Sequence, residues 1–137
     1  MKTFNCRIIE ADNSFYSGEM VSLIVPALDG DYGVLAMHQN VVVAIIPGWL
    51  KFQTEDGEWH DAAVSDGMMR VEDGEVLILV DSAEWPDEID IERVKAKEAA
   101  AREAMLQKKS VREYTLAEAS LKRAVARLKV KDGGFNG

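Results

Sequence analysis

Residues 75–90, EVLILVDSAEWPDEID, mark the point at which the chain changes its periodicity. EVLILV is an apolar, β-branched run typical of a buried strand. Pro86 is disfavoured inside a strand or a helix and indicates a boundary. Asp90 is a residue type that caps helices, and neither glycine nor proline follows it until Gly133. The stretch therefore separates a β-rich N-terminal part from a helical C-terminal part.

The part before this boundary consists of short apolar runs separated by turn residues. Asp-Gly pairs in LDGD (28–31), EDGE (55–58) and EDGE (72–75) are hairpin signals, because glycine adopts positive φ at little cost. Pro47-Gly48 interrupts the run VVVAIIPGWL and predicts a bend between two strands. Such short connections predict antiparallel pairing. We expect residues 1–85 to form an all-β sandwich of about ten short strands.

The part after the boundary predicts an antiparallel α-helical hairpin, assigned to residues 86–137, with helices over about 90–107 and 111–131. The first helix is rich in strong helix formers. Ser110, followed three residues later by Glu113, is a capping-box pattern that starts the second. An apolar seam with spacings of three and four runs along the second helix: Tyr114, Ala117, Leu121, Ala124 and Leu128.

This hairpin has little apolar surface of its own, because its first helix contributes mainly alanines. Helices in proteins gain most of their stability from tertiary packing. The sequence therefore leaves two arrangements open. The helices are either a fixed pair lying on the sandwich or a marginally held arm with two resting positions.

Charge is divided unequally between the two parts of a chain whose formal net charge is −8. Residues 1–89 hold four basic and 17 acidic residues, a charge of −13, whereas residues 90–131 hold 12 basic and six acidic residues, a charge of +6. The split suggests different partners, unless the cations only keep the helices soluble. The acidic sandwich argues against nucleic acid, and the basic arm favours an acidic protein surface. Direct membrane insertion is not expected, because no apolar run reaches the roughly 18 residues of a membrane span.

Catalytic and metal-binding motifs are not found in the sequence. Cys6 is the single cysteine, and His38 and His60 are far apart, so no metal site is predicted. The sequence has no Gly-Lys-Ser/Thr phosphate loop and no Gly-x-Ser-x-Gly nucleophile motif. We expect no catalytic residue. The remaining enzyme alternative is a cupin-like metalloenzyme, which would require a metal near one of the two histidines.

The stretch LDGDYGVLAMH (28–38) combines glycine, acidic and aromatic residues in a way that needs its own interpretation. It contains no lysine, and its aspartates would repel a phosphate. It also supplies too few oxygen ligands for a calcium loop. We interpret it as a turn that presents Asp31 and Tyr32 to a partner.

Four motifs together resemble a known family: MVSLIVPALDGDYGVLAMH (20–38), VSDG (64–67), VLILVDSAEWPDEID (76–90) and ASLKRAVARL (119–128). They are similar to the epsilon subunit of bacterial F-type ATP synthases, over nearly the whole chain and in the same order of parts. The resemblance implies a non-catalytic central-stalk subunit that couples proton transport to ATP synthesis and inhibits ATP hydrolysis through its hairpin. The implied partners are the gamma subunit, the c-subunit ring and the alpha and beta catalytic subunits. The implied location is peripheral, on the cytoplasmic side of the cell membrane.

The resemblance also implies two protein contact sites. Asp31, Tyr32 and His38 correspond to the loop that faces the c-ring, although Ala36-Met37 replaces a common Pro-Gly pair and Asn40 replaces a proline. A second set of residues, on the second helix, would approach an acidic loop of a beta subunit during inhibition. These residues are Arg112, Lys122, Arg123 and Arg127.

Some members of this family bind ATP as a regulatory ligand through Ile-Asp-x-x-Arg-Ala, which reads IDIERV here. The implied site comprises Glu84, Ile89, Asp90, Arg93, Arg123 and Arg127. Two positions depart from the pattern: Val94 replaces the alanine, and Ala100 replaces an arginine, with Arg102 close by. The same residues are also compatible with a capped helix start carrying surface arginines. No cofactor is required and no hydrolysis is expected here. A stand-alone ATP-sensing module is the alternative function.

Overall fold

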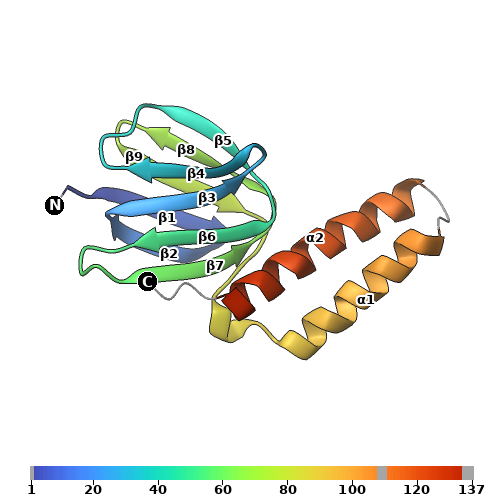
Figure 1. Ribbon diagram of the computed structural model, residues 1–137. Helices are drawn as coiled ribbons and strands as arrows, with labels where there is room; N and C mark the ends of the chain where they lie inside the picture. Colours follow the sequence, from blue (N-terminus) through green and yellow to red (C-terminus); the bar gives the residue numbers. More distant parts are fainter. Residues whose placement is uncertain (1, 108–110, 134–137) are drawn as a thin grey trace.

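The computed structural model describes residues 2–107 and 111–133, and it consists of a β-sandwich followed by two helices (Figure 1). The strands are β1 (Phe4–Glu10), β2 (Asn13–Met20), β3 (Ser22–Ala27), β4 (Gly30–Leu35), β5 (Val41–Ile45), β6 (Gly48–Gln53), β7 (Trp59–Val64), β8 (Gly67–Glu72), β9 (Glu75–Val80) and β10 (Ala83–Glu84). A 3-10 turn, η1 (Pro86–Glu88), leads to α1 (Ile91–Gln107) and α2 (Val111–Gly133). The predicted fold class is therefore confirmed.

The strands form two layers that are joined at one point. One layer has the order β10-β7-β6-β3, with β4 paired to β3, and the other has the order β5-β8-β9-β1-β2. The only register pair between β3 and β5 is Ala27 with Ile45. The strand pairs are antiparallel except β1 and β9, which are parallel with Ile8 opposite Ile78. The prediction of antiparallel pairing is wrong for this pair, because β1 and β9 are distant in sequence and no short turn sets their direction.

The three predicted Asp-Gly turns are confirmed. In the turn between β8 and β9, Asp73 and Gly74 have φ values of 52° and 79°, which suits a two-residue hairpin turn. The first of these hairpins differs from expectation because β4 begins within it, at Gly30. Asp31 consequently lies on a strand, opposite Pro26, and the residues at the tip are Leu28 and Asp29.

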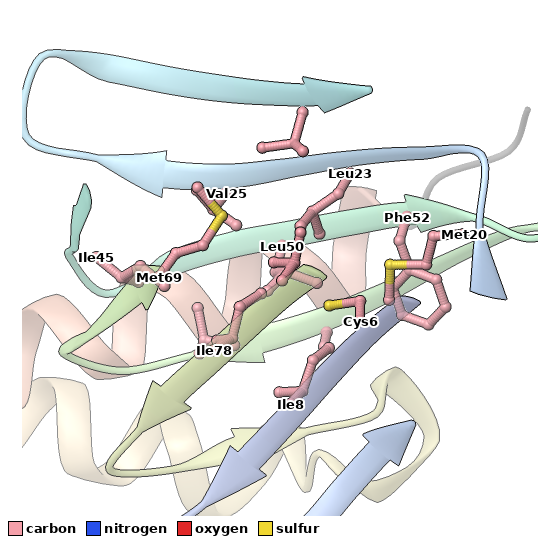
Figure 2. Close-up of a cluster of buried hydrophobic side chains, with 14 of the residues drawn as sticks. Cys6, Ile8, Met20, Leu23, Val25, Ile45, Leu50, Phe52, Met69 and Ile78 are labelled. Atoms are coloured by element: carbon pink, nitrogen blue, oxygen red, sulfur yellow. The ribbon is translucent and has the colours of Figure 1, made fainter. Parts of the chain in front are cut away.

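A core of large apolar side chains fills the space between the two layers (Figure 2). All of its fully buried members lie between Phe4 and Ala83, so the sandwich has a core independent of the helices. Cys6 belongs to it, and burial raises the pKa of its thiol to about 12. Gly67 permits a close strand approach, since a Cβ there would lie 2.0 Å from the carbonyl oxygen of Leu79.

The junction between sandwich and helices is fixed by stacking and capping. Trp85 stacks on Phe15 with ring centroids 4.2 Å apart. Glu88 Oε1 accepts a hydrogen bond from the backbone N–H of Trp85, the N-cap of η1, at 2.9 Å. Asp90 Oδ1 accepts one from the Arg93 N–H at 3.2 Å. Asp90 is therefore the N-cap of α1, as predicted.

The hairpin docks on the sandwich through α2, whose C-terminal half contacts β6 and β7 (Figure 1). A second buried cluster forms this interface: Ala63, Ile89, Val94, Ala124 and Val130, with Trp49 and Leu128 partly buried against it. The buried side chains of α1 are Val94 and Ala101. α2 extends two residues beyond its predicted end at Lys131, and the predicted cap at Ser110 lies outside the described residues. Neither α1 nor α2 combines the length and apolar character needed to cross a membrane.

Candidate functional site

A cavity of about 370 Å³ lies where the end of the sandwich meets both helices. Its lining comes from β1, β10, η1, α1, α2 and two connecting residues, Ser82 and Asp90. The lining residues are Glu10, Ser82, Glu84, Glu88, Asp90, Arg93, Val94, Lys97 and Arg127. Four of the six residues predicted for ATP binding are in this lining: Glu84, Asp90, Arg93 and Arg127. The fold thus brings the end of β10, the start of α1 and the last third of α2 to one place.

An ion pair crosses the cavity between the two parts of the molecule. Arg127 Nε lies 2.6 Å from Glu84 Oε1, and the two side chains are 21% and 26% exposed. This partial burial makes the pair less screened by solvent than a surface pair. Lys131 adds a second link, because its ammonium donates to the Pro86 carbonyl oxygen at 2.9 Å.

The other two predicted ATP-binding residues lie close by but outside this lining. Ile89 is 4% exposed and belongs to the second buried cluster, so it positions the junction by packing. Arg123 lies one turn before Arg127 on α2. It lines a small adjoining space with Arg127, Ser65 and Ser82.

An open groove of about 630 Å³ runs between α1 and α2 next to the cavity. Much of its wall is alanine: Ala100, Ala101, Ala104, Ala117 and Ala124. Lys97, Arg123 and Arg127 add three cations to this wall. Arg102 is not in the lining, and its guanidinium lies 3.9 Å from Glu98 on α1. Arg102 therefore does not supply the charge that Ala100 lacks.

The stretch 28–38 holds a second group of predicted residues. The Tyr32 hydroxyl lies 3.1 Å from His38 Nε2, and His38 Nδ1 lies 2.7 Å from the Gln39 carbonyl oxygen. Tyr32 also packs partly against the main core, so it and His38 have structural partners within the chain. Asp31 is exposed on β4. Three apolar side chains of this stretch are also exposed: Leu28, Leu35 and Met37.

Two family models match consecutive parts of this chain. The model for the beta-sandwich domain of the ATP synthase delta/epsilon chain matches residues 3–86, and the model for its long alpha-helix domain matches residues 87–132. The chain belongs to the ATP synthase delta/epsilon chain family. An ATP synthase epsilon chain from Caldanaerobacter subterraneus is 40% identical over 129 residues, covering 94% of each chain. Another, from Ruminiclostridium cellulolyticum, is 40% identical over 128 residues, covering 93% of this chain and 95% of the relative.

Solved structures share the fold of this delta/epsilon family member. A chain of the mitochondrial ATP synthase of Euglena gracilis (OSCP/F1/c-ring) superimposes with a TM-score of 0.82 at 24% identity, covering 93% of this chain and 80% of that one. A chain of the central stalk and c-ring structure from the Tetrahymena thermophila mitochondrial ATP synthase has a TM-score of 0.64 at 12% identity, covering 95% and 97%. At these identities the likeness concerns the fold alone.

The four cations predicted for inhibition in this delta/epsilon chain fall into two groups. Arg112 and Lys122 are exposed, and the Lys122 ammonium lies 3.9 Å from Glu118 one turn earlier. Arg123 and Arg127 face the groove and the sandwich instead. In this docked arrangement Arg127 is paired with Glu84, and its side chain is 21% exposed, so most of it is covered by the protein itself.

Sequence reasoning missed several lining residues of the cavity: Glu10, Ser82, Glu88 and Lys97. The spacing of Arg93 and Lys97, four residues apart on one helix, could have indicated Lys97. Glu10 and Ser82 are brought there by the pairing of β1 with β9, for which the sequence holds no local signal. Within residues 2–107 and 111–133, no three His, Cys, Asp or Glu side chains are grouped so as to hold a metal ion.

Proposed function

We propose that this chain works as the epsilon subunit of an F-type proton-translocating ATP synthase. In this role it is a non-catalytic part of the central stalk, bound peripherally on the cytoplasmic side of the cell membrane, and it helps couple proton transport to ATP synthesis. The observation that carries the proposal is the match of both domain models, in order, over residues 3–132. The curated relatives at 40% identity, named ATP synthase epsilon chains, support it.

The two parts of the molecule divide this work. The sandwich binds the gamma subunit and rests on the c-subunit ring, with Asp31 as the exposed acidic contact and with Tyr32 and His38 supporting the loop. Its self-contained core suits an element that must transmit torque without deforming. The hairpin makes the regulatory contact with the alpha and beta subunits.

ATP acts in this proposal as a regulatory ligand of the docked hairpin. Arginine side chains suit phosphate oxygens, and carboxylates accept hydrogen bonds from an amine or a ribose hydroxyl. Arg127 lines the cavity and Arg123 lines the space beside it, so neither can contact a nucleotide there and a beta subunit at the same time. A nucleotide bound there therefore favours the docked arrangement over the inhibitory one by mass action.

Reconstitution with a shortened chain tests the division of labour. The chain ending at Asp87 keeps every fully buried residue of the main core, so we expect it to fold. It should bind a membrane ATPase stripped of this subunit, yet inhibit ATP hydrolysis less than the full chain. Equal inhibition by both chains would contradict the role of the hairpin, and failure of the folded sandwich to bind would contradict the role of the sandwich.

Charge reversal tests the electrostatic part of the inhibition. Arg123→Glu with Arg127→Glu should weaken inhibition of ATP hydrolysis, and added salt should weaken wild-type inhibition in the same way. Lys95→Glu with Arg102→Glu is the matched control, because it makes the same change of charge on exposed positions of α1. Equal loss in the two double variants would indicate that net charge, rather than these two arginines, governs inhibition.

The cavity gives one observation in favour of a stand-alone ATP-sensing module. Capture of the tagged chain from detergent-solubilised membranes separates the two functions. Co-purification with the catalytic subunits of an ATPase supports the rotor role. ATP binding by a chain that never associates with the ATPase would support the sensor instead.

A further inference from the structure

We propose that Lys97 binds the terminal phosphate of a nucleoside triphosphate in the cavity between sandwich and hairpin. This inference rests on the nucleotide site proposed above and adds a residue to it. The sequence motif that implied the site does not include Lys97.

Lys97 lies at the boundary between the cavity and the groove. It lines both the 370 Å³ cavity and the 630 Å³ groove between the helices, as does Arg127. One cation from α1 and one from α2 therefore lie at the boundary that the cavity and the groove share. Lys97 is exposed, so its ammonium can move toward a ligand without leaving a buried position.

The distribution of charge in the cavity and the groove determines the orientation of a bound nucleotide. The sandwich end of the cavity is lined by carboxylates: Glu10, Glu84, Glu88 and Asp90. These groups repel phosphates and accept hydrogen bonds from an amine or a ribose hydroxyl. The groove has three cations and one carboxylate, Glu113, in its lining. A polyphosphate chain is consequently directed past Arg93 and toward Lys97 and Arg127.

Apart from Arg93 and Lys97, α1 supplies no positive charge to the lining of the cavity or the groove. Ala100 is the next position on the same face, and it has no charge. The Arg102 side chain is 59% exposed and pairs with Glu98 outside the groove lining. Lys95 is exposed and is in neither lining. After Arg93, Lys97 is thus the α1 cation placed to meet phosphate.

Calorimetric titration of the full chain with ATP and with ADP tests the inference. Lys97→Ala should weaken ATP binding by about 5- to 10-fold, because an exposed charge-assisted hydrogen bond is lost. ADP binding should change by less than about threefold, so the preference for ATP over ADP narrows. Lys95→Ala, which removes the same charge from the same helix, should leave both affinities within about twofold. The melting temperature of unliganded Lys97→Ala should stay at the wild-type value, because the side chain is exposed.

The outcomes separate the inference from the function on which it rests. If Lys97→Ala binds ATP as the wild type does, or loses ATP and ADP affinity equally, the assignment of Lys97 is wrong and the nucleotide site stands. If the wild-type chain binds neither nucleotide, the proposed nucleotide site is wrong and Lys97 has no phosphate to bind.

Discussion

The sandwich and the hairpin bury different kinds of side chain. The sandwich encloses large ones between its two layers, among them Phe52, Ile8 and Met69, each fully buried. The buried residues of the hairpin are small: Val94, Ala101, Ala117, Ala124, Ala126 and Val130. Because hydrophobic stabilisation scales with buried apolar area, most of the stability belongs to the sandwich. The hairpin is therefore held in place by a few contacts at one end.

Those contacts are specific and few among the described residues. They comprise the second buried cluster, the Glu84–Arg127 ion pair and the hydrogen bond from Lys131 to Pro86. Such a boundary allows the hairpin to leave the sandwich without unfolding it. Substitutions in the sandwich and in the hairpin contacts should therefore differ in how much stability they remove. They should also differ in how much of the molecule they destabilise.

The largest effect is expected in the core of the sandwich. Ile78→Ala should lower the free energy of unfolding by about 2–5 kcal/mol, because it removes buried apolar contacts and leaves a cavity. Ile78 is fully buried between the layers, so the loss should appear as a shifted urea midpoint for the whole sandwich. The same shift should be found in the chain that ends at Asp87. A shift confined to the full chain would show that the sandwich core depends on the helices.

A pH-dependent effect should arise from Cys6, also within the sandwich. Burial raises the pKa of its thiol from 9.0 to about 12, so above pH 9 the unfolded chain releases a proton that the folded protein keeps. The stabilisation is complete below the unfolded pKa and is lost as the pH rises toward the folded pKa, by about 1.4 kcal/mol per pH unit.

The pH-dependent contribution of Cys6 to the free energy of unfolding can be measured by urea unfolding of the wild type and of Cys6→Ala. The useful range is pH 8 to about 10.5, where the thiol of the unfolded chain ionises. The alanine variant should have a lower stability and a shallower decline with pH. Parallel declines in the two proteins would show that the thiol does not titrate differently in the folded state.

Val130→Ala should weaken the docking of the hairpin and leave the sandwich unchanged. Val130 is fully buried in the second cluster, and the loss of two methyl groups should cost about 1–2 kcal/mol. The measurement is limited proteolysis, in which α2 should be cleaved faster while the urea midpoint of the sandwich stays within error. Faster cleavage of the sandwich strands as well would mean that the two parts open together.

Glu84→Gln should produce a smaller change at the same boundary. It removes the charge that faces Arg127, so the hairpin contact should weaken by about 1 kcal/mol, and less at high salt. Proteolysis of α2 at low and at high salt measures this difference. If salt affects the wild type and the variant alike, the ion pair does not contribute to docking.

The smallest effect is expected on the exposed face of α2. Lys122→Ala removes a surface pair with Glu118, whose atoms are 3.9 Å apart, and should change stability by less than about 0.5 kcal/mol. Thermal unfolding should therefore match the wild type. A clear loss of stability would assign Lys122 a contact with the sandwich and weaken its proposed role toward a beta subunit.

Local signals in the sequence predicted much of the fold. Asp73-Gly74 specified a hairpin turn, Pro86 marked the boundary, and Asp90 capped α1 as expected. The turn between β1 and β2 contains no glycine, and Ala11 adopts a φ of 50° there. The sequence pattern does not predict β4, because its glycine-containing stretch is typical of a turn.

Contacts between distant residues could not be derived from local pattern. The pairing of β1 with β9 and the ion pair of Glu84 with Arg127 depend on tertiary topology. The same holds for Asn40, whose Oδ1 accepts a hydrogen bond from the Asp73 N–H at 2.9 Å. Family resemblance named six residues for this site, and four of them lie in the cavity lining: Glu84, Asp90, Arg93 and Arg127.

Native-state hydrogen exchange of the isolated full chain measures whether the hairpin opens separately from the sandwich. We predict that amides of α1 and α2 exchange through openings at least about 2 kcal/mol easier than those of β1, β8 and β9, which should exchange only on global unfolding. Equal opening free energies for the helices and these strands would show instead that the hairpin is an inseparable part of the sandwich.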